Sequence, residues 1–336
     1  MPETTAAAAG GLLRQAVARE LDRLLEAPLT PGLHLVATPI GHLGDISLRA
    51  LAVLAKADIV CCEDTRHSLR LLERYGIRRS LSAYHEHNAA RERPRLLQAL
   101  AEAKSIALVS DAGTPLISDP GYKLVQEALA AGRAVTSVPG ASAVLAALTM
   151  SGQPTDCFTF AGFLPSRAGQ RLQRLRALAE APGSLVLFEA PGRVADTLAA
   201  ASEALGASRQ AVLARELTKL HEELWHGTLR DLAERAGGEA PRGEVVIVVA
   251  PHVTNTKHIG NEEIAQALKH EQNGTLRDRV DAVAGRLGIP RKRVYALALV
   301  QQSHRESPAQ RPPAEPTDMS SSSEPRAEEG AWGEEE

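Results

Sequence analysis

The sequence predicts an α/β protein with two α/β domains and a small C-terminal helical module. Short apolar runs recur along the chain, each ends in a polar or glycine-rich loop, and helical periodicity separates one run from the next. Strands separated by helices imply a parallel sheet. The 336 residues leave room for two domains, and 44% hydrophobic residues with only 3% aromatics fit an alanine-, leucine- and valine-rich α/β enzyme.

The first 150 residues are expected to form two segments. Residues 1–31 form an N-terminal helical extension, because leucines recur at helical spacing until Pro28. Residues 32–150 form the first α/β domain, in which Ser47 is expected to cap the helix after the first strand. The strands of this domain are predicted at 33–37, 59–62, 81–83, 106–109 and 134–138.

The remainder of the chain divides into three segments. Residues 151–252 form the second α/β domain, with two amphipathic helices and a hairpin-like element around 225–229. Its strands are predicted at 157–161, 185–188, 211–214 and 244–250. Residues 260–300 form the helical module, which resembles a helix-turn-helix and would either contact nucleic acid or stabilise a dimer. Residues 301–336, with three arginines against nine acidic residues, are expected to be a disordered acidic tail.

Composition excludes several classes of protein. Outside the tail, 35 basic residues face 32 acidic ones, a balance that neither requires nor excludes a nucleic-acid partner. The three cysteines provide no disulfide framework and no metal-ligand spacing, so no metal is expected. No apolar stretch approaches the ~18 residues that a membrane helix needs. We therefore expect a cytoplasmic protein without membrane association.

The loop Ser110–Gly121 is the most informative stretch of the chain. It follows a predicted buried strand and offers two carboxylates, several hydroxyls and two glycines, but no lysine. Loops at the carboxyl ends of parallel strands hold the ligands of open α/β sheets. This chemistry favours a nucleoside-like cofactor over a triphosphate. The absence of the dinucleotide and phosphate-loop motifs argues against an NAD enzyme or an NTPase.

Charged residues also follow two other predicted strands. Glu63, Asp64 and Arg66 come directly after four apolar residues, where unpaired burial would cost several kcal/mol. Either Asp64 and Arg66 form an internal ion pair, or a carboxylate accepts a hydrogen bond from a ribose or reacting hydroxyl while Arg66 faces a phosphate. His85 and His87 are expected to bind substrate or cap the strand end, because no third metal ligand accompanies them.

Taken in order, the loops carry a family resemblance. The motifs are Thr38–Gly41 with Asp45, Glu63–Arg66, His85–Asn88, Ser110–Gly121, Pro139-Gly140, Gly162–Pro165, Arg215–Lys219 and Arg242–Glu244. They resemble the tetrapyrrole-methylase fold family, and within it the bacterial branch that methylates the 2′-oxygen of a cytidine ribose in 16S rRNA. The resemblance covers residues 33–300. It implies a cleft between the two α/β domains that holds S-adenosyl-L-methionine, a homodimer, and the small ribosomal subunit as partner.

The resemblance also implies site residues. The expected cofactor contacts are Pro39, Gly41, Asp111, Gly113, Thr114, Ile117, Ser142, Ala143 and Phe188. The expected contacts to substrate RNA are Arg167, Arg171, Arg193, Arg215 and Lys219. The chain departs from the family pattern at His42, where asparagine is usual, at Ala141, where proline is common, and at Gly192, where a histidine often precedes Arg193.

A ribose hydroxyl is a weak nucleophile, so a base within hydrogen-bond reach would assist the transfer. The candidates are Glu63, Asp64, His85 and His87, of which Asp64 and His85 are favoured, with Arg66 beside them. Two other functions stay open. One is a methyltransferase for a tetrapyrrole-type small molecule, which would have no use for the arginine clusters. The other is a catalytically idle RNA-binding assembly factor, which would have lost the Ser110–Gly121 loop.

Overall fold

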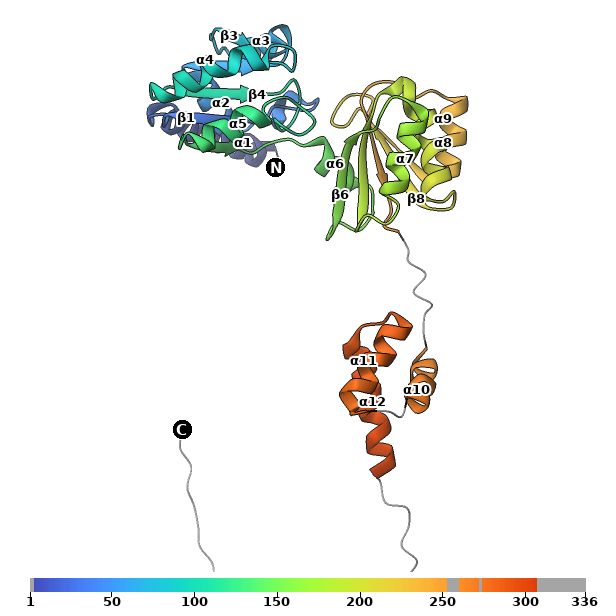
Figure 1. The fold of residues 1–336 in the computed structure, drawn as a ribbon. Helices are drawn as coiled ribbons and strands as arrows, with labels where there is room; N and C mark the ends of the chain where they lie inside the picture. Colours follow the sequence, from blue (N-terminus) through green and yellow to red (C-terminus); the bar gives the residue numbers. More distant parts are fainter. Residues whose placement is uncertain (1–2, 253–259, 272–273, 307–336) are drawn as a thin grey trace, which may run out of the picture. The chain divides into compact units, whose positions relative to one another are not determined.

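The computed structural model describes residues 3–252, 260–271 and 274–306. The chain forms two compact units, Met1–His252 and Val253–Glu336, and each is described by itself (Figure 1). The first unit contains two five-stranded sheets. Most of the expected acidic tail, residues 307–336, lies outside the described residues.

The first sheet is entirely parallel, as its strand–helix alternation predicts. Its strand order is β3-β2-β4-β1-β5. All five predicted strands are present, with bounds within one residue of those expected. They are β1 (Gly32–Val36), β2 (Ile59–Cys62), β3 (Leu81–Ala83), β4 (Ser105–Val109) and β5 (Val135–Val138).

Helices cover both faces of this sheet. Residues of α2 and Leu72 of α3 pack with one set of inward-facing strand residues, and residues of α4 and α5 pack with the other. The Ser47 hydroxyl accepts a hydrogen bond from the Ala50 N–H and so caps α2 as expected. The helices are α2 (Leu48–Lys56), α3 (Thr65–Arg74), α4 (Ala89–Ala101) and α5 (Tyr122–Ala130).

The strand order creates a topological switch point between β1 and β4. After β1 the chain passes through α2 to β2 on one side of the sheet, whereas after β4 it passes through α5 to β5 on the other. Loops that leave adjacent strands in opposite directions open a crevice, and open α/β sheets bind ligands there. The two loops concerned are residues 37–47, which contain the short helix η1 (Leu43–Asp45), and Ser110–Gly121.

The N-terminal extension is one helix, α1 (Glu3–Glu26), which ends before Pro28 as predicted. The Lys56 ammonium of α2 donates to the Leu24 and Ala27 carbonyls and so binds the end of α1 to the first sheet's helices. Leu12 and Leu13 near the middle of α1 remain exposed.

The second sheet is mixed, with order β6-β7-β10-β8-β9; only the β6–β7 pair is parallel. One face packs against three helices, where the sequence indicated two. The helix it missed, α9, begins at a capping box formed by Thr228 and Asp231. The elements are α6 (Ala143–Met150), β6 (Phe158–Phe163), α7 (Ala168–Ala177), β7 (Ser184–Glu189), η2 (Pro191–Arg193), α8 (Val194–Leu205), β8 (Gln210–Arg215), β9 (Glu223–Thr228), α9 (Leu229–Gly238) and β10 (Val245–Val249).

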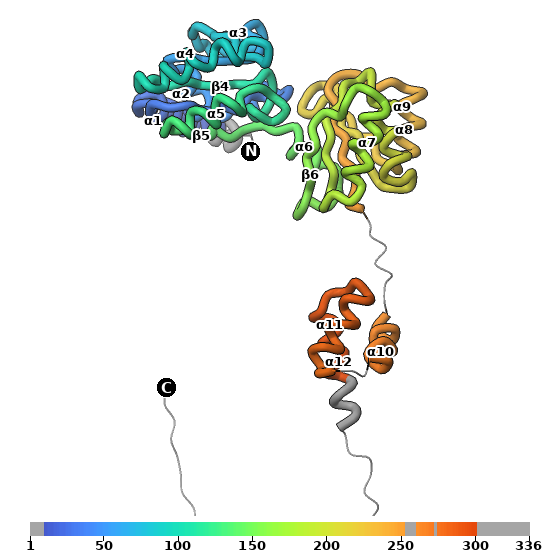
Figure 2. The backbone as a smooth tube through the Cα atoms, in the orientation of Figure 1, coloured from blue at the N-terminus to red at the C-terminus, as the bar shows by residue number. Residues whose placement is uncertain are grey.

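The second unit contains α10 (Asn261–His270), α11 (Leu276–Leu287) and α12 (Arg291–Glu306), which pack as a small bundle (Figure 2). Ile264, Val280 and Val294 are fully buried at its centre. Helix α12 continues to Glu306, beyond residue 300 where the helical module was expected to end. Within the described ranges, no helix is both long and apolar enough to cross a membrane.

Candidate active site

Backbone hydrogen bonds join the two loops at the switch point. The Thr38 N–H donates to the Gly113 carbonyl at 2.9 Å, and the Gly113 N–H donates to the Thr38 carbonyl at 3.1 Å. The Thr38 hydroxyl adds a bond of 3.2 Å to the Ser110 carbonyl. Gly113 has φ +80°, a conformation that strains any residue with a side chain. The position that the sequence assigned to cofactor binding is therefore also the position where the two loops meet.

Strained backbone is concentrated in two loops. Among the described residues, five non-glycine residues have positive φ, and four of them are Leu116, Ser118, Glu216 and Thr218. The first two lie in the Ser110–Gly121 loop, and the other two in the loop after β8. Residues in this region cost on the order of 1–3 kcal/mol each and gather at functional sites.

The loop after β8 contacts the loop after β1. The His42 N–H donates to the Thr218 hydroxyl at 3.0 Å. A Cβ on Gly41 would lie 2.5 Å from Lys219 Cγ and 2.9 Å from the Leu217 carbonyl oxygen. Position 41 therefore accepts only glycine unless the two loops move apart.

These loops enclose a pocket of about 370 Å³. Pro39, Gly41 and Asp111 line it from the first sheet, and Lys219 and Glu244 line it from the second. Its volume lies within the range of about 300–1,000 Å³ that is typical of small-molecule sites. The structure thus brings three of the expected cofactor residues together in one cavity.

The other expected cofactor residues do not line this pocket. The Thr114 hydroxyl donates to the Ala141 carbonyl at 3.1 Å, and the Ser142 hydroxyl caps α6. Ala143 and Phe188 belong to an apolar cluster that also contains Ile40 of the first loop. Ile117 is 41% exposed.

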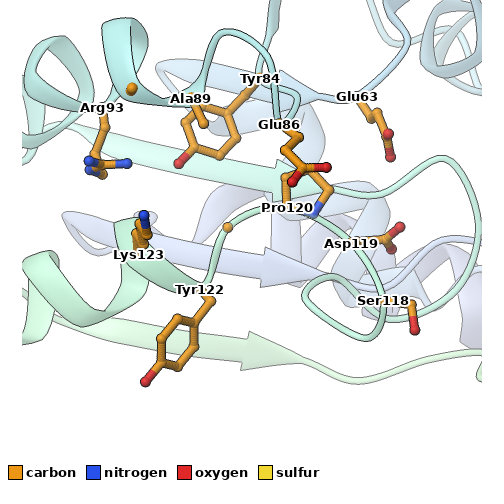
Figure 3. A pocket seen from close by; sticks show the side chains of 12 residues that line it. Glu63, Tyr84, Glu86, Ala89, Arg93, Ser118, Asp119, Pro120, Tyr122 and Lys123 are labelled. Carbon is orange, nitrogen blue, oxygen red and sulfur yellow. The ribbon is translucent and has the colours of Figure 1, made fainter. Parts of the chain in front are cut away.

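A second pocket of about 480 Å³ lies at the other end of the Ser110–Gly121 loop. Three carboxylates, those of Glu63, Glu86 and Asp119, line it, together with two cations, Arg93 and Lys123. In Figure 3 the Glu63 and Asp119 carboxylates lie toward one end of the pocket, and Arg93 and Lys123 lie toward the other.

Two of these carboxylates hold their protons more tightly than usual. Burial, with the nearby charge of Glu63, raises the pKa of Asp119 to about 6. Burial, with the charge of Asp111, also raises the pKa of Glu63. A carboxylate with a pKa near neutrality accepts a proton far more readily than an ordinary one, which is the property a general base needs.

Asp64 behaves differently from its neighbours. Its carboxylate accepts from the Arg66 N–H at 2.8 Å, caps α3, and forms an ion pair with the Arg66 guanidinium at 2.8 Å. These bonds lower the pKa of Asp64 to about 2. The internal ion pair, the first of the two interpretations above, is the one the structure contains. So acidic a carboxyl is a weak proton acceptor, which disfavours Asp64 as the base.

His85 retains a free hydrogen-bonding atom. Its ring Nδ1 is buried and has no partner among the described residues, while its backbone N–H donates to Asn88 Oδ1 at 2.9 Å. The His85 and His87 rings lie 6.1 Å apart, edge to face. His85 therefore remains a candidate to hydrogen-bond a substrate. Within the described ranges, no group of three or more His, Cys, Asp or Glu residues is placed to hold a metal ion.

Four of the five expected RNA contacts are paired inside the protein. Arg171 is only 5% exposed and pairs with Asp196 at 3.5 Å. The other three pairs are Arg193 with buried Glu189 (3.2 Å), Arg215 with Glu223 (3.0 Å), and Lys219 with Glu216 (3.0 Å). Arg167 alone is exposed, at the start of α7. Burial excludes Arg171 from a docking surface, and the other three would have to give up existing pairs.

Sequence reasoning missed two features of the site. One is Asp119, the second carboxylate of the loop that was singled out. The other is a row of exposed arginines on α3, of which Arg70 lines the smaller pocket. The sequence signal for the second was present, because Arg66, Arg70 and Arg74 recur at intervals of four. His42, where the family usually has asparagine, can fill the same capping role. Its ring Nδ1 accepts a hydrogen bond from the Gly44 N–H at 3.1 Å and caps η1.

A doubly wound parallel sheet and a mixed sheet, with a pocket at the switch point of the first, are typical of a ligand-binding α/β enzyme. The family of Tetrapyrrole (Corrin/Porphyrin) Methylases matches residues 32–233, and the chain belongs to this family. It is also similar to two proteins named Ribosomal RNA small subunit methyltransferase I. The Mesorhizobium japonicum protein is 59% identical over 67% of this chain and 76% of its own length. The Pasteurella multocida protein is 40% identical over 81% of this chain and 98% of its own.

Solved structures support the fold. A conserved hypothetical protein from Aeropyrum pernix K1 has a TM-score of 0.54 at 19% identity, over 84% of this chain and all of that chain. A diphthine synthase has a TM-score of 0.52 at 18% identity, over 65% of this chain and 89% of that one. At this level of identity, the likeness establishes the fold alone.

Proposed function

We propose that the protein is an S-adenosylmethionine-dependent methyltransferase that methylates a ribose 2′-oxygen, at a cytidine in the decoding region of 16S rRNA. Membership of a methylase family and similarity to small-subunit rRNA methyltransferases support the reaction and the RNA substrate. The observation that carries the proposal is the pocket at the switch point, where Pro39, Gly41 and Asp111 meet. A ribosomal substrate implies a cytoplasmic protein, and the family resemblance implies a homodimer.

The smaller pocket fits the methyl donor in size and chemistry. S-adenosylmethionine supplies a methyl group on a positively charged sulfur. Gly41 lines this pocket, and its missing Cβ lets the loop after β1 pack closely against Leu217 and Lys219. The Asp111 carboxylate accepts from the Asp64 N–H through Oδ1 at 2.9 Å, which fixes its position beside the pocket. The chain's main task is then to position donor and acceptor.

The second pocket supplies the proton acceptor. We assign this role to Asp119, with Glu63 beside it, rather than to Asp64. The ionised Asp119 would take the proton from the ribose hydroxyl as the oxygen attacks the methyl group. Burial, with the nearby charge of Glu63, raises the pKa of Asp119. The free Nδ1 of His85 would orient the ribose by a hydrogen bond. No step requires a metal.

The test is methyl transfer from labelled S-adenosylmethionine to small ribosomal subunits that lack the modification, with free 16S rRNA alongside. We expect label at one decoding-region cytidine, in a ribose linkage that resists alkaline cleavage. Asp111→Ala should abolish both transfer and donor binding. Donor binding without label in either RNA would contradict the RNA substrate and indicate a small-molecule acceptor. An absence of donor binding would contradict the proposal that the protein is an S-adenosylmethionine-dependent methyltransferase.

A further inference from the structure

Helix α3 carries three exposed arginines at intervals of four residues: Arg66, Arg70 and Arg74, defined here as the α3 arginine stripe. Side chains four apart lie on the same side of a helix, and eight residues span about 12 Å. The stripe is therefore a line of positive charge on one flank of α3.

The stripe lies beside the candidate active site. Arg70, with His67 of the same helix, lines the pocket that contains Gly41 and Asp111. Arg74 lines the neighbouring pocket, which contains His42 and Thr218. A ligand held along the stripe would thus lie next to the loops that bind the methyl donor.

Two of the three arginines of the stripe have no ion-pair partner among the described residues. Arg66 pairs with Asp64, but its side chain is 87% exposed, so it can also reach an external anion. Arg70 and Arg74 form no ion pair with any described residue, and this includes Glu73, the only acid on α3. Like charges at i and i+4 destabilise a helix by about 0.2–0.5 kcal/mol per pair.

In helix α4 of the same domain, by contrast, the arginines form ion pairs. It also carries three arginines, but Arg91 and Arg95 pair with Glu92, at 3.2 Å and 3.1 Å. Arg93 pairs with Glu127 of α5 at 2.7 Å. Each α4 arginine thus has an ion-pair partner within the fold, whereas Arg70 and Arg74 of α3 have none among the described residues.

We propose that the α3 arginine stripe binds the sugar–phosphate backbone of the substrate RNA next to the target nucleotide. The proposal rests on the proposed function for the identity of the polyanion. Planar guanidinium groups bind phosphate oxygens in pairs of hydrogen bonds, which gives orientation as well as affinity. The stripe therefore places the RNA strand along α3, so that one ribose reaches the active-site loops. These contacts carry no base specificity.

The test is the affinity of the full-length protein for unmodified 16S rRNA, measured without the methyl donor over a range of salt concentrations. The variant is Arg70→Gln with Arg74→Gln. Its matched control is Arg91→Gln with Arg95→Gln, which removes the same charge from α4. Each phosphate contact contributes about 0.7–0.9 to the slope of log affinity against log salt. We expect the α3 variant to lose affinity about tenfold or more and about 1.5 of this slope, and the α4 control to keep both.

Equal losses in the two variants would overturn the proposal, because the effect would then follow net charge rather than the stripe. Unchanged affinity and slope in the α3 variant, while the wild-type protein binds and methylates RNA, would overturn it and leave the proposed function intact. If the wild-type protein binds RNA through the stripe but transfers no methyl group, the proposed function fails instead. Arg70→Lys with Arg74→Lys should recover most of the slope, which excludes misfolding as the cause.

Discussion

The two sheets of the first unit use charged side chains in opposite ways. At the carboxyl edge of the parallel sheet, Asp119 and Glu63 line one pocket, where burial and nearby negative charge raise the pKa of both carboxyls. Arg70 lines another pocket and has no ion pair among the described residues. In the mixed sheet, charges of both signs are joined. Buried Glu189, for example, accepts a hydrogen bond from the Thr197 hydroxyl and pairs with Arg193.

Whether a charged side chain is paired therefore distinguishes functional residues from structural ones better than its residue type does. Charged side chains that have a shifted pKa or no ion-pair partner in the folded protein can act on a ligand. Charges already paired and hydrogen-bonded contribute to stability mainly because their loss would leave a partner unpaired. We therefore expect substitutions in the first sheet to change activity and those in the second to change stability.

The largest expected effect is at Asp119. Asp119→Asn removes the proposed proton acceptor and keeps the side chain's shape, so the rate of methyl transfer should fall about 10²-fold or more. Single-turnover transfer to unmodified small subunits, at saturating donor, measures this rate. Asp64→Asn is the comparison, and it should reduce the rate less. A greater loss in Asp64→Asn would restore the assignment made from sequence.

The second prediction concerns stability in the mixed sheet. Arg193→Met removes the cation beside Glu189, whose side chain is fully buried, and should lower the free energy of unfolding by about 3–5 kcal/mol. Denaturant unfolding checks it. The matched control is Arg176→Met, whose partner Glu203 is exposed, so a change of about 0–1 kcal/mol is expected. Equal effects in the two variants would contradict a structural role for the Glu189 pair.

The third prediction tests the contact between the two loops at the smaller pocket. Gly41→Ala forces its Cβ against the Leu217 carbonyl, so the loops must separate and donor affinity should fall about tenfold. Calorimetric titration with S-adenosylmethionine measures the affinity. Gly192→Ala is the control, because its Cβ would meet no atom within 4 Å. Unchanged affinity in Gly41→Ala would show that this contact does not shape the donor site.

The smallest expected effect is an increase in the free energy of unfolding of Asp119→Asn at high pH. The folded-state pKa of Asp119, about 6, lies above its ordinary value of 3.8. The folded state therefore binds the proton more tightly, and ionised Asp119 destabilises it above about pH 6. Asp119→Asn should be more stable than the wild-type protein at pH 8, and the difference should shrink as the pH falls toward 4. Thermal unfolding at several pH values tests the sign, and a loss of stability at pH 8 would contradict it.

Local features were the part of this fold that sequence could predict. The Ser47 cap and the end of β2 at Cys62 depend on neighbouring residues, and both were placed correctly. The Ser110–Gly121 loop was also found, because turn-forming residues directly follow an apolar strand. Helix α9 was not predicted, although Thr228 and Asp231 of its capping box could be recognised in the sequence.

The rest of the site depends on contacts distant in sequence. The burial of Arg171 results from α8, which presents Asp196 to it. The high pKa of Asp119 results from burial in the folded protein and from the charge of Glu63, which follows the strand β2 earlier in the chain. The charges and spacing of these residues were visible in the sequence, but their neighbours were not. Sequence therefore located the loops, whereas the pairing and burial of individual side chains within them depend on the folded structure.

The pH dependence of methyl transfer tests the central claim most directly, because the two candidate carboxylates differ widely in pKa. With Asp119 as the base, the single-turnover rate should fall about tenfold per pH unit below about pH 6, and the residual rate of Asp119→Asn should not follow this titration. With Asp64, whose pKa is about 2, the wild-type rate would stay level down to pH 4. A level profile would contradict the account, whereas a break near pH 6 that disappears in Asp119→Asn would support it.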